Sequence, residues 1–291
     1  VGVYPIIRRL LQRLETLQRS VQRFGEGDLS VRVSEQGQDE VADLARQFNA
    51  AATRIEALVK THKSLLANAS HELRSPLTRI RMGLELMGGN QPSPAFREEI
   101  LRNIAELDQL VDEILLASRL DAREADVGTV ELVDLIGLAA EECARVDADL
   151  DVTAVPEGLE VRGVAKLLRR ALRNLLENAR RYSQGDITVV LQRHDGQAQV
   201  SVLDRGPGVP PALRERIFEP FYRLPGASER AGGVGLGLAL VRSIAQRHNG
   251  SVRCEDQPDG SGGACFVLRL PLHSRPGTAA PAPQRKGTGA K

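Results

Sequence analysis

The sequence predicts a multidomain chain. An all-α N-terminal part includes a hairpin that forms half of a dimeric four-helix bundle, and an α+β sandwich follows. Three observations support this fold class. Apolar residues recur every three or four positions through the first 120 residues. Short alternating segments replace that pattern in the second half. The length of 291 residues exceeds one typical domain.

The composition excludes several classes of protein. The net charge is +1, aromatic residues make up 3%, and Trp is absent, so nothing favours a nucleic-acid partner. Three cysteines without C-x-x-C spacing argue against zinc and a disulfide framework. No apolar run is long enough to span a bilayer. Because the chain begins at Val1 without Met, we expect a membrane or sensor segment upstream. Residues 273–291 are rich in Pro, Gly and Ala and are expected to be disordered.

Residues 5–58 contain two amphipathic stretches joined by a glycine break and an extended connector. The two stripes are Ile7, Leu10, Leu14, Leu17, Val21 and Phe24, then Val41, Leu44, Phe48, Ala51, Ile55 and Leu58. Such narrow stripes need helical partners. The arrangement resembles a HAMP signal-relay module, which implies a parallel four-helix bundle of two copies below a membrane. An ordinary helical hairpin is the alternative.

Residues 59–122 predict a second helical hairpin. The second helix runs on without a break to a turn at residues 88–94, and a return helix follows. The hairpin carries more apolar surface than one copy can bury. The residues concerned are Leu66, Leu73, Leu77, Leu84, Leu107, Val111 and Ile114. We therefore expect a homodimer closed as a four-helix bundle.

The most informative segment is His71-Glu72-Leu73-Arg74-Ser75-Pro76-Leu77-Thr78-Arg79. On a helix His71 and Ser75 share one face, Glu72 can accept the imidazole N–H, and Pro76 should bend the helix. A lone histidine is more often a surface residue. The whole segment, however, resembles the phosphoacceptor site of sensor histidine kinases. That resemblance implies that His71 accepts a phosphoryl group and that Glu72 orients it as a base.

The same resemblance implies a role for Ser75 in dephosphorylation of the partner regulator. In the family this position orients the water that removes phosphate from the partner regulator. Many relatives have Thr or Asn there. Serine can still hydrogen-bond a water, but it lacks the methyl group that restricts Thr, which leaves the strength of phosphatase activity open.

Residues 127–272 predict the α+β sandwich, with helices on one sheet face. The expected strands are Val130–Leu132, Val152–Ala154, Leu159–Val161, Ile187–Arg193, Ala198–Asp204, Ser251–Glu255 and Ala264–Leu270. The expected helices are Leu135–Ala148, Val164–Tyr182 and Gly235–His248.

Four segments of this domain, beginning at Asn174, Asp204, Ile217 and Gly232, resemble in order the ATP-binding segments of histidine kinases. Histidine kinases share this ATPase superfamily with gyrase and the heat-shock chaperones. The resemblance implies ATP as substrate and Mg²⁺ held by Asn178, whose oxygen suits that cation. It places Phe218 and Phe221 where they seat a mobile lid, and the glycine loop where it binds triphosphate. The implied ATP-binding residues are Asn174, Asn178, Arg181, Tyr182, Asp204, Gly206, Gly208, Phe218, Phe221, Gly233, Gly235, Leu236, Gly237 and Leu238.

One departure from the superfamily favours a kinase. Hydrolytic relatives carry a water-activating Glu where this chain has Asn174. The expectation is therefore a dimeric autokinase that phosphorylates His71 and passes the phosphoryl group to an Asp of a response-regulator receiver domain. It would work at the cytoplasmic face of a bacterial inner membrane. The alternatives are a non-catalytic dimeric relay and a stand-alone ATPase of the chaperone or gyrase type.

Overall fold

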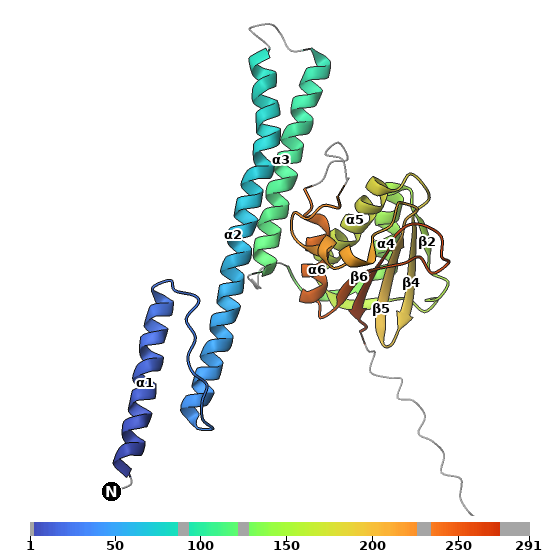
Figure 1. The fold of residues 1–291 in the computed structure, drawn as a ribbon. Coiled ribbons are helices and arrows are strands. Elements are labelled where there is room, and N and C mark those ends of the chain that lie inside the picture. The colour runs from blue at the N-terminus through green and yellow to red at the C-terminus, as the bar shows by residue number, and fades with distance from the viewer. Residues whose placement is uncertain (1–2, 87–92, 122–127, 226–233, 274–291) are drawn as a thin grey trace, which may run out of the picture. The chain divides into compact units, whose positions relative to one another are not determined.

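A computed structural model describes residues 3–86, 93–121, 128–225 and 234–273. The chain forms two compact units, Val1–Glu124 and Ala125–Lys291. We call them the helical unit and the α/β unit. Figure 1 shows that the first contains helices alone, whereas the second combines helices and sheet.

The helical unit contains three helices, of which the second is by far the longest. They are α1 (Val3–Gly25), α2 (Glu40–Leu86) and α3 (Pro94–Asp121). The first part of α2 lies beside α1 and its later part lies beside α3 (Figure 1). The 47 residues of α2 therefore run without interruption from the predicted HAMP module through the His71 segment.

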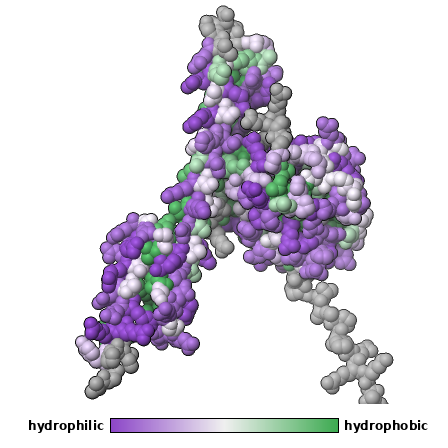
Figure 2. Space-filling view, viewed as in Figure 1, coloured by the Kyte–Doolittle hydropathy of each residue, from purple (hydrophilic) through white to green (hydrophobic). Residues whose placement is uncertain are grey.

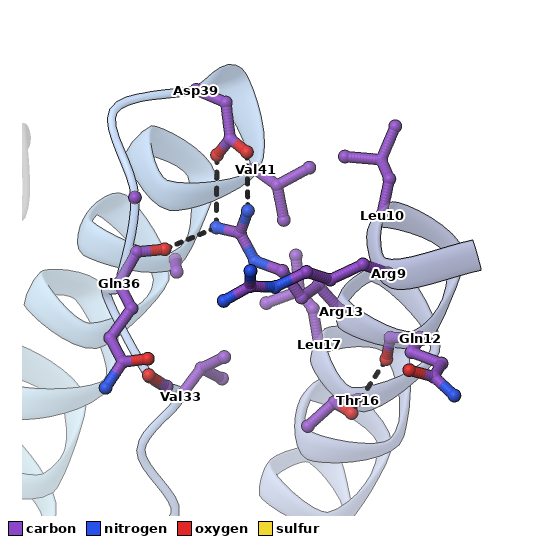
Figure 3. A pocket seen from close by; sticks show the side chains of 13 residues that line it. Arg9, Leu10, Gln12, Arg13, Thr16, Leu17, Val33, Gln36, Asp39 and Val41 are labelled. Atoms are coloured by element: carbon purple, nitrogen blue, oxygen red, sulfur yellow. Dashed lines mark hydrogen bonds and ion pairs between the residues drawn. The ribbon is translucent and has the colours of Figure 1, made fainter. Parts of the chain in front are cut away.

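Two polar side chains fix the connector between α1 and α2. Asn49 accepts a hydrogen bond from the backbone N–H of Val33 at 2.9 Å and donates one to its carbonyl at 2.8 Å. Asp39 accepts from the backbone N–H of Ala42 in the first turn of α2. Arg13 reaches from α1 to both oxygens of Asp39, at 2.5 and 3.0 Å, and to the carbonyl of Gln36 (Figure 3). The carboxylate thus caps α2 and fastens it to α1.

Large apolar side chains remain exposed along the helical unit, where Figure 2 shows hydrophobic colour at the surface. They include Leu10, Leu14, Val21, Leu44, Ile55, Leu66, Leu77, Leu84, Ile104 and Val111. Most of the fully buried positions next to α1 are small, namely Ala42, Ala45 and Ala52. One copy of the chain therefore leaves most of its predicted stripes uncovered.

The α/β unit contains a small and a large sheet. Strands β1 (Glu131–Asp134) and β3 (Glu160–Gly163) form an antiparallel pair. The five-stranded sheet has the order β2-β4-β5-β7-β6, antiparallel except for the β2–β4 pair. Its strands are β2 (Asp149–Asp151), β4 (Thr188–His194), β5 (Gln197–Leu203), β6 (Ser251–Glu255) and β7 (Cys265–Pro271).

Helices α4 (Leu135–Val146), α5 (Ala165–Tyr182) and α6 (Gly237–Arg247) cover one face of the large sheet (Figure 1). Alternate residues of neighbouring strands point at them, as the buried register pairs Leu191–Val200 and Val200–Leu268 show. Two 3₁₀ turns, Pro211–Leu213 and Arg216–Phe218, follow β5.

The predicted α+β sandwich with helices on one sheet face is confirmed, and its three helices lie within two residues of the expected bounds. The strand expected at Val152–Ala154 is wrong, because β2 precedes it. The side chain of Asp151 accepts from the backbone N–H of Thr153 at 2.9 Å and from its hydroxyl at 2.7 Å. This Asx turn ends the strand and leaves the apolar residues after it in a bend.

Candidate functional site

His71 lies in the interior of α2 with its side chain exposed. Ser75 is exposed one turn later. Pro76 lies buried inside the same helix and does not end it. The imidazole is therefore accessible to a reaction partner in the solvent or on another domain. The expected hydrogen bond from His71 to Glu72 stays a prediction.

The predicted nucleotide site joins α5 to the start of α6. The Asn174 side chain is buried, and its Nδ2 donates to the carbonyl of Gly237 at 3.1 Å. This bond links the first nucleotide segment to the fourth, 63 residues away. Asn178 lies one turn further along α5 and is half-buried. No hydrogen bond to its side chain is found within the described ranges, so its oxygen is available to a ligand.

The first turn of α6 is suited to an anion. Leu236 stands at its N-cap and provides no side-chain cap, so the described residues place no side-chain acceptor on the first backbone N–H groups of the helix. Gly235 has φ +80° and its carbonyl accepts from Phe221 N–H at 2.9 Å. Leu236 itself is fully buried, whereas Leu238 is half-buried. Gly233 lies outside the described residues.

Asp204 follows the central strand β5 and is 3% exposed. Its Oδ1 accepts from the backbone N–H groups of Gly206 at 2.8 Å and Ala264 at 3.2 Å. Within the described part of the chain, no hydrogen bond reaches Oδ2. Backbone N–H groups therefore fix one carboxylate oxygen, while the other can accept a hydrogen bond from the amino group of a base.

The turn after Asp204 requires glycine. A Cβ on Gly206 would lie 2.6 Å from the Tyr182 carbonyl oxygen. Gly208 has φ +73°, and a Cβ there would meet the Gly263 carbonyl at 3.0 Å. Ser183 adds a further tie, because its hydroxyl accepts from Arg205 N–H at 3.1 Å. The turn is thus held against the end of α5, where Arg181 and Tyr182 are exposed.

Phe218 lies in the core of the α/β unit, which agrees with its predicted role of seating a lid, while its contact with ATP stays a prediction. It is 3% exposed and packs edge-on against Phe266 of β7, with ring centroids 6.4 Å apart. Arg242 of α6 lies 5.6 Å over the same ring. The described residues therefore place Phe218 in the core, where it anchors the segment that continues to Phe221. Phe221 is half-buried and adopts φ 62°.

Sequence reasoning missed an ion pair behind the site. Glu142 of α4 is 2% exposed and accepts from Arg173 Nε and Nη2, each at 2.9 Å. Arg169 donates to it at 3.3 Å. Hydrogen bonds from Arg173 lower the pKa of Glu142, and burial opposes that shift. Arg173 precedes Asn174, so the pair fixes α5 where it carries the site. An acidic residue in an apolar helix was the only available signal.

Three family models match the chain in sequence order. The HAMP domain matches residues 6–57, the His Kinase A (phospho-acceptor) domain matches residues 61–123, and the histidine kinase-, DNA gyrase B- and HSP90-like ATPase matches residues 163–274.

Individual relatives agree with these matches. Sensor protein RstB of Escherichia coli K12 is 35% identical over 93% of this chain and 63% of its own length. The histidine-protein kinase/phosphatase MprB of Mycobacterium sp. strain KMS is 33% identical over 81% of this chain and 48% of its own length. The chain thus spans about half to two thirds of these relatives. The structure of histidine kinase ThkA in complex with response regulator protein TrrA has the same fold, with TM-score 0.60 and 24% identity over 81% of this chain and 68% of that one.

HAMP, phospho-acceptor and ATPase domains follow one another in a single chain, and the relatives that match across them are sensor kinases. The chain therefore belongs to the sensor histidine kinases of two-component systems.

Proposed function

We propose that this chain is an ATP-dependent autokinase whose phosphoacceptor is His71. The observation that carries the proposal is an exposed histidine on α2 in the same chain as the candidate nucleotide site around Asp204, Asn178 and the start of α6. In that site Asp204 offers its free oxygen to the adenine amino group. The N-terminus of α6, Arg181 and the loop at Gly235 would bind the phosphates.

The donor set also fits Mg²⁺. Asn178 carries an amide oxygen without a partner among the described residues. It lies one turn from Asn174, which contacts the end of α6 that we propose to bind phosphate. Oxygen donors beside phosphates are what this cation prefers. Asn178 would hold it, and the bound ion would neutralise charge on the phosphate oxygens.

The reaction is an in-line transfer. A ring nitrogen of neutral His71 forms a bond to the γ-phosphorus while the bond from phosphorus to the bridging β–γ oxygen breaks. The electron pair stays on ADP. Glu72 is proposed to hold the ring N–H, so that the other nitrogen presents its lone pair. The phosphoryl group would then pass to an aspartate of a response regulator.

Asn174 argues against the stand-alone ATPase. Its amide is buried and bonded to the Gly237 carbonyl, so this position contributes a structural bond and no carboxylate base. ATP bound there would be spared from water and kept for the histidine. The non-catalytic relay is disfavoured because the nucleophile, the base-binding carboxylate and the uncapped helix end are all present.

The proposed organisation is a HAMP module at 5–58, a dimerisation and phosphotransfer hairpin at 59–122, an ATP-binding domain at 127–272 and a tail at 273–291. The exposed stripes of the helical unit support a homodimer. A membrane or sensor segment upstream and a site at the cytoplasmic face of the inner membrane are part of the same proposal. No helix among the described residues is long and apolar enough to cross a membrane.

The test is incubation with γ-labelled ATP and Mg²⁺, followed by acid treatment. The chain should acquire an acid-labile label, and His71→Gln should abolish it while nucleotide binding persists. Asp204→Ala should weaken ATP and ADP alike in calorimetry. Acid-labile label in the His71→Gln variant would reject the assignment.

A further inference from the structure

Arg79 of α2 forms the most extensive side-chain contact network near the phosphoacceptor. It lies two turns after His71 and one turn after Ser75. Nε donates to Oδ1 of Asn103 at 2.8 Å, Nη2 donates to Oε2 of Glu106 at 2.7 Å, and Nη1 donates to Oγ of Ser75 at 3.3 Å. All three guanidinium nitrogens thus have separate acceptors on two helices, which fixes the side chain in one orientation.

The partners on α3 strengthen this placement. Asn103 is 7% exposed, and its own Nδ2 donates to the Glu99 carbonyl at 2.9 Å, so its oxygen is oriented toward Arg79. The pair with Glu106 is half-exposed and provides charge compensation. The guanidinium therefore has a firm buried contact on one side and a solvated one on the other.

Ser75 behaves differently from the neighbouring hydroxyls on α2. Ser70 and Thr78 each donate to the carbonyl four residues earlier, at 2.8 Å. Within the described residues, the one hydrogen bond to the Ser75 hydroxyl comes from Arg79. A serine hydroxyl has two acceptor lone pairs and one donor proton. Arg79 occupies one lone pair and leaves the second for another partner.

We propose that Arg79 is a positioning residue for dephosphorylation of the partner regulator, and that it does for Ser75 what a methyl group does for threonine. It holds the hydroxyl in one rotamer with a lone pair directed outward, where a water can donate to it. This inference rests on the proposed function, because it concerns a water aligned at the same helical face as His71.

The supported reaction is hydrolysis of an aspartyl phosphate. The oxygen of the aligned water bonds to phosphorus as the bond from phosphorus to the aspartyl oxygen breaks. The electron pair remains on the aspartate carboxylate, and both water protons leave with inorganic phosphate. Ser75 aligns the water, Arg79 aligns Ser75, and no covalent intermediate forms on either residue.

The experiment uses the full chain and, as probe, whichever purified receiver domain in a panel takes label fastest from phosphorylated His71. Autophosphorylation and loss of label from the receiver are measured side by side with ADP present. Arg79→Ala should lower the ratio of dephosphorylation to autophosphorylation by about tenfold or more, because a freely rotating hydroxyl misplaces the water. Arg81→Ala is the matched control, since Arg81 pairs with Glu85 on the outer surface of the same helix.

Two further variants separate positioning from packing. Ser75→Thr combined with Arg79→Ala should recover most of the lost ratio, because the methyl group restricts the hydroxyl again. Glu106→Gln weakens the pair with α3 but keeps the Ser75 contact, so it should retain more phosphatase activity than Arg79→Ala. Thermal unfolding of each variant reports on hairpin stability.

The proposal is overturned if Arg79→Ala matches the wild type, if the wild type shows no phosphatase activity, or if Glu106→Gln is equally damaging and Ser75→Thr gives no recovery. Failure of the wild type to label His71 would instead reject the autokinase itself. The two failures are therefore distinguishable.

Discussion

The helical unit and the α/β unit differ in how completely a single chain buries its large apolar side chains. In the α/β unit, Leu175, Leu176 and Ile187 are at most 1% exposed, and the unit closes its own core. In the helical unit, Leu66, Leu77 and Leu84 are each more than half exposed. The α/β unit should be stable alone, whereas the helical unit should reach its full stability only with a second copy of the chain. A signal acting on the interface between copies can therefore reshape one unit without unfolding the other.

Ion pairs follow the same contrast and provide the largest expected effect. Glu142→Ala would leave Arg173 without its buried partner, which should cost about 3–5 kcal/mol of stability in the α/β unit. The matched change in the helical unit is Glu56→Ala, which removes a half-exposed pair with Arg32 and should cost about 0–1 kcal/mol. Calorimetric unfolding of both variants measures the difference. Equal losses would contradict the contrast in burial.

Replacing a core leucine by alanine should affect stability differently in the two units when the protein concentration is varied. Leu176→Ala should cost about 2–5 kcal/mol at any protein concentration, since the cavity lies inside one chain. Leu77→Ala should instead lower the dimerisation affinity, so that its effect on the unfolding midpoint varies with concentration. Sedimentation and thermal unfolding over a hundredfold concentration range would test this. A monomeric wild-type chain at micromolar concentration would argue against the dimer.

The smallest expected effect concerns pH. His248 accepts from Val164 N–H through Nε2 at 3.0 Å, and its Nδ1 lies 2.7 Å from the Ile244 carbonyl. Burial lowers the pKa of His248 below its usual 6.5. The neutral form therefore stabilises the fold above about pH 6.5, and that contribution is lost as the pH falls through the lowered pKa.

In the helical unit, a hydrogen bond from Ser30 lowers the pKa of Asp28, and one from Arg13 lowers the pKa of Asp39. Both carboxyl groups therefore have pKa values below the usual 3.8. The α/β unit should thus weaken first as the pH falls. His248→Gln removes the titrating group and should flatten the change in the unfolding midpoint between pH 7 and 5. An unchanged slope would mean that another group is responsible.

Local patterns predicted the elements well, because each depends on residues close in sequence. Alternation located β4 and β5 within one residue, and the stripe of α5 located that helix. The exception at Asp151 arose because a side-chain turn competes with the ladder for the backbone. Hydrophobicity alone does not register that competition.

Contacts between distant residues could not be predicted from the sequence. The bonds from Asn174 to Gly237 and from Arg79 to Asn103 join residues 63 and 24 positions apart. Resemblance to a family placed Asn174 at a nucleotide site but gave no partner for it. Phe218 was predicted to seat a lid, but its packing partner Phe266, 48 positions away along the sequence, could not be named from local pattern. Only tertiary structure shows which core residue such an aromatic side chain packs against.

From Glu40 to His71, before Pro76, α2 runs without interruption and forms a rod about 50 Å long, at about 1.5 Å per residue. In such a helix, the direction in which His71 points about the helix axis is fixed relative to the residues that contact α1. One residue inserted between Leu58 and His71 would turn the histidine by about 100° relative to the α1 contact, whereas seven would return it to within about 20°. Signal strength in this chain should therefore depend on insertion length as a periodic function.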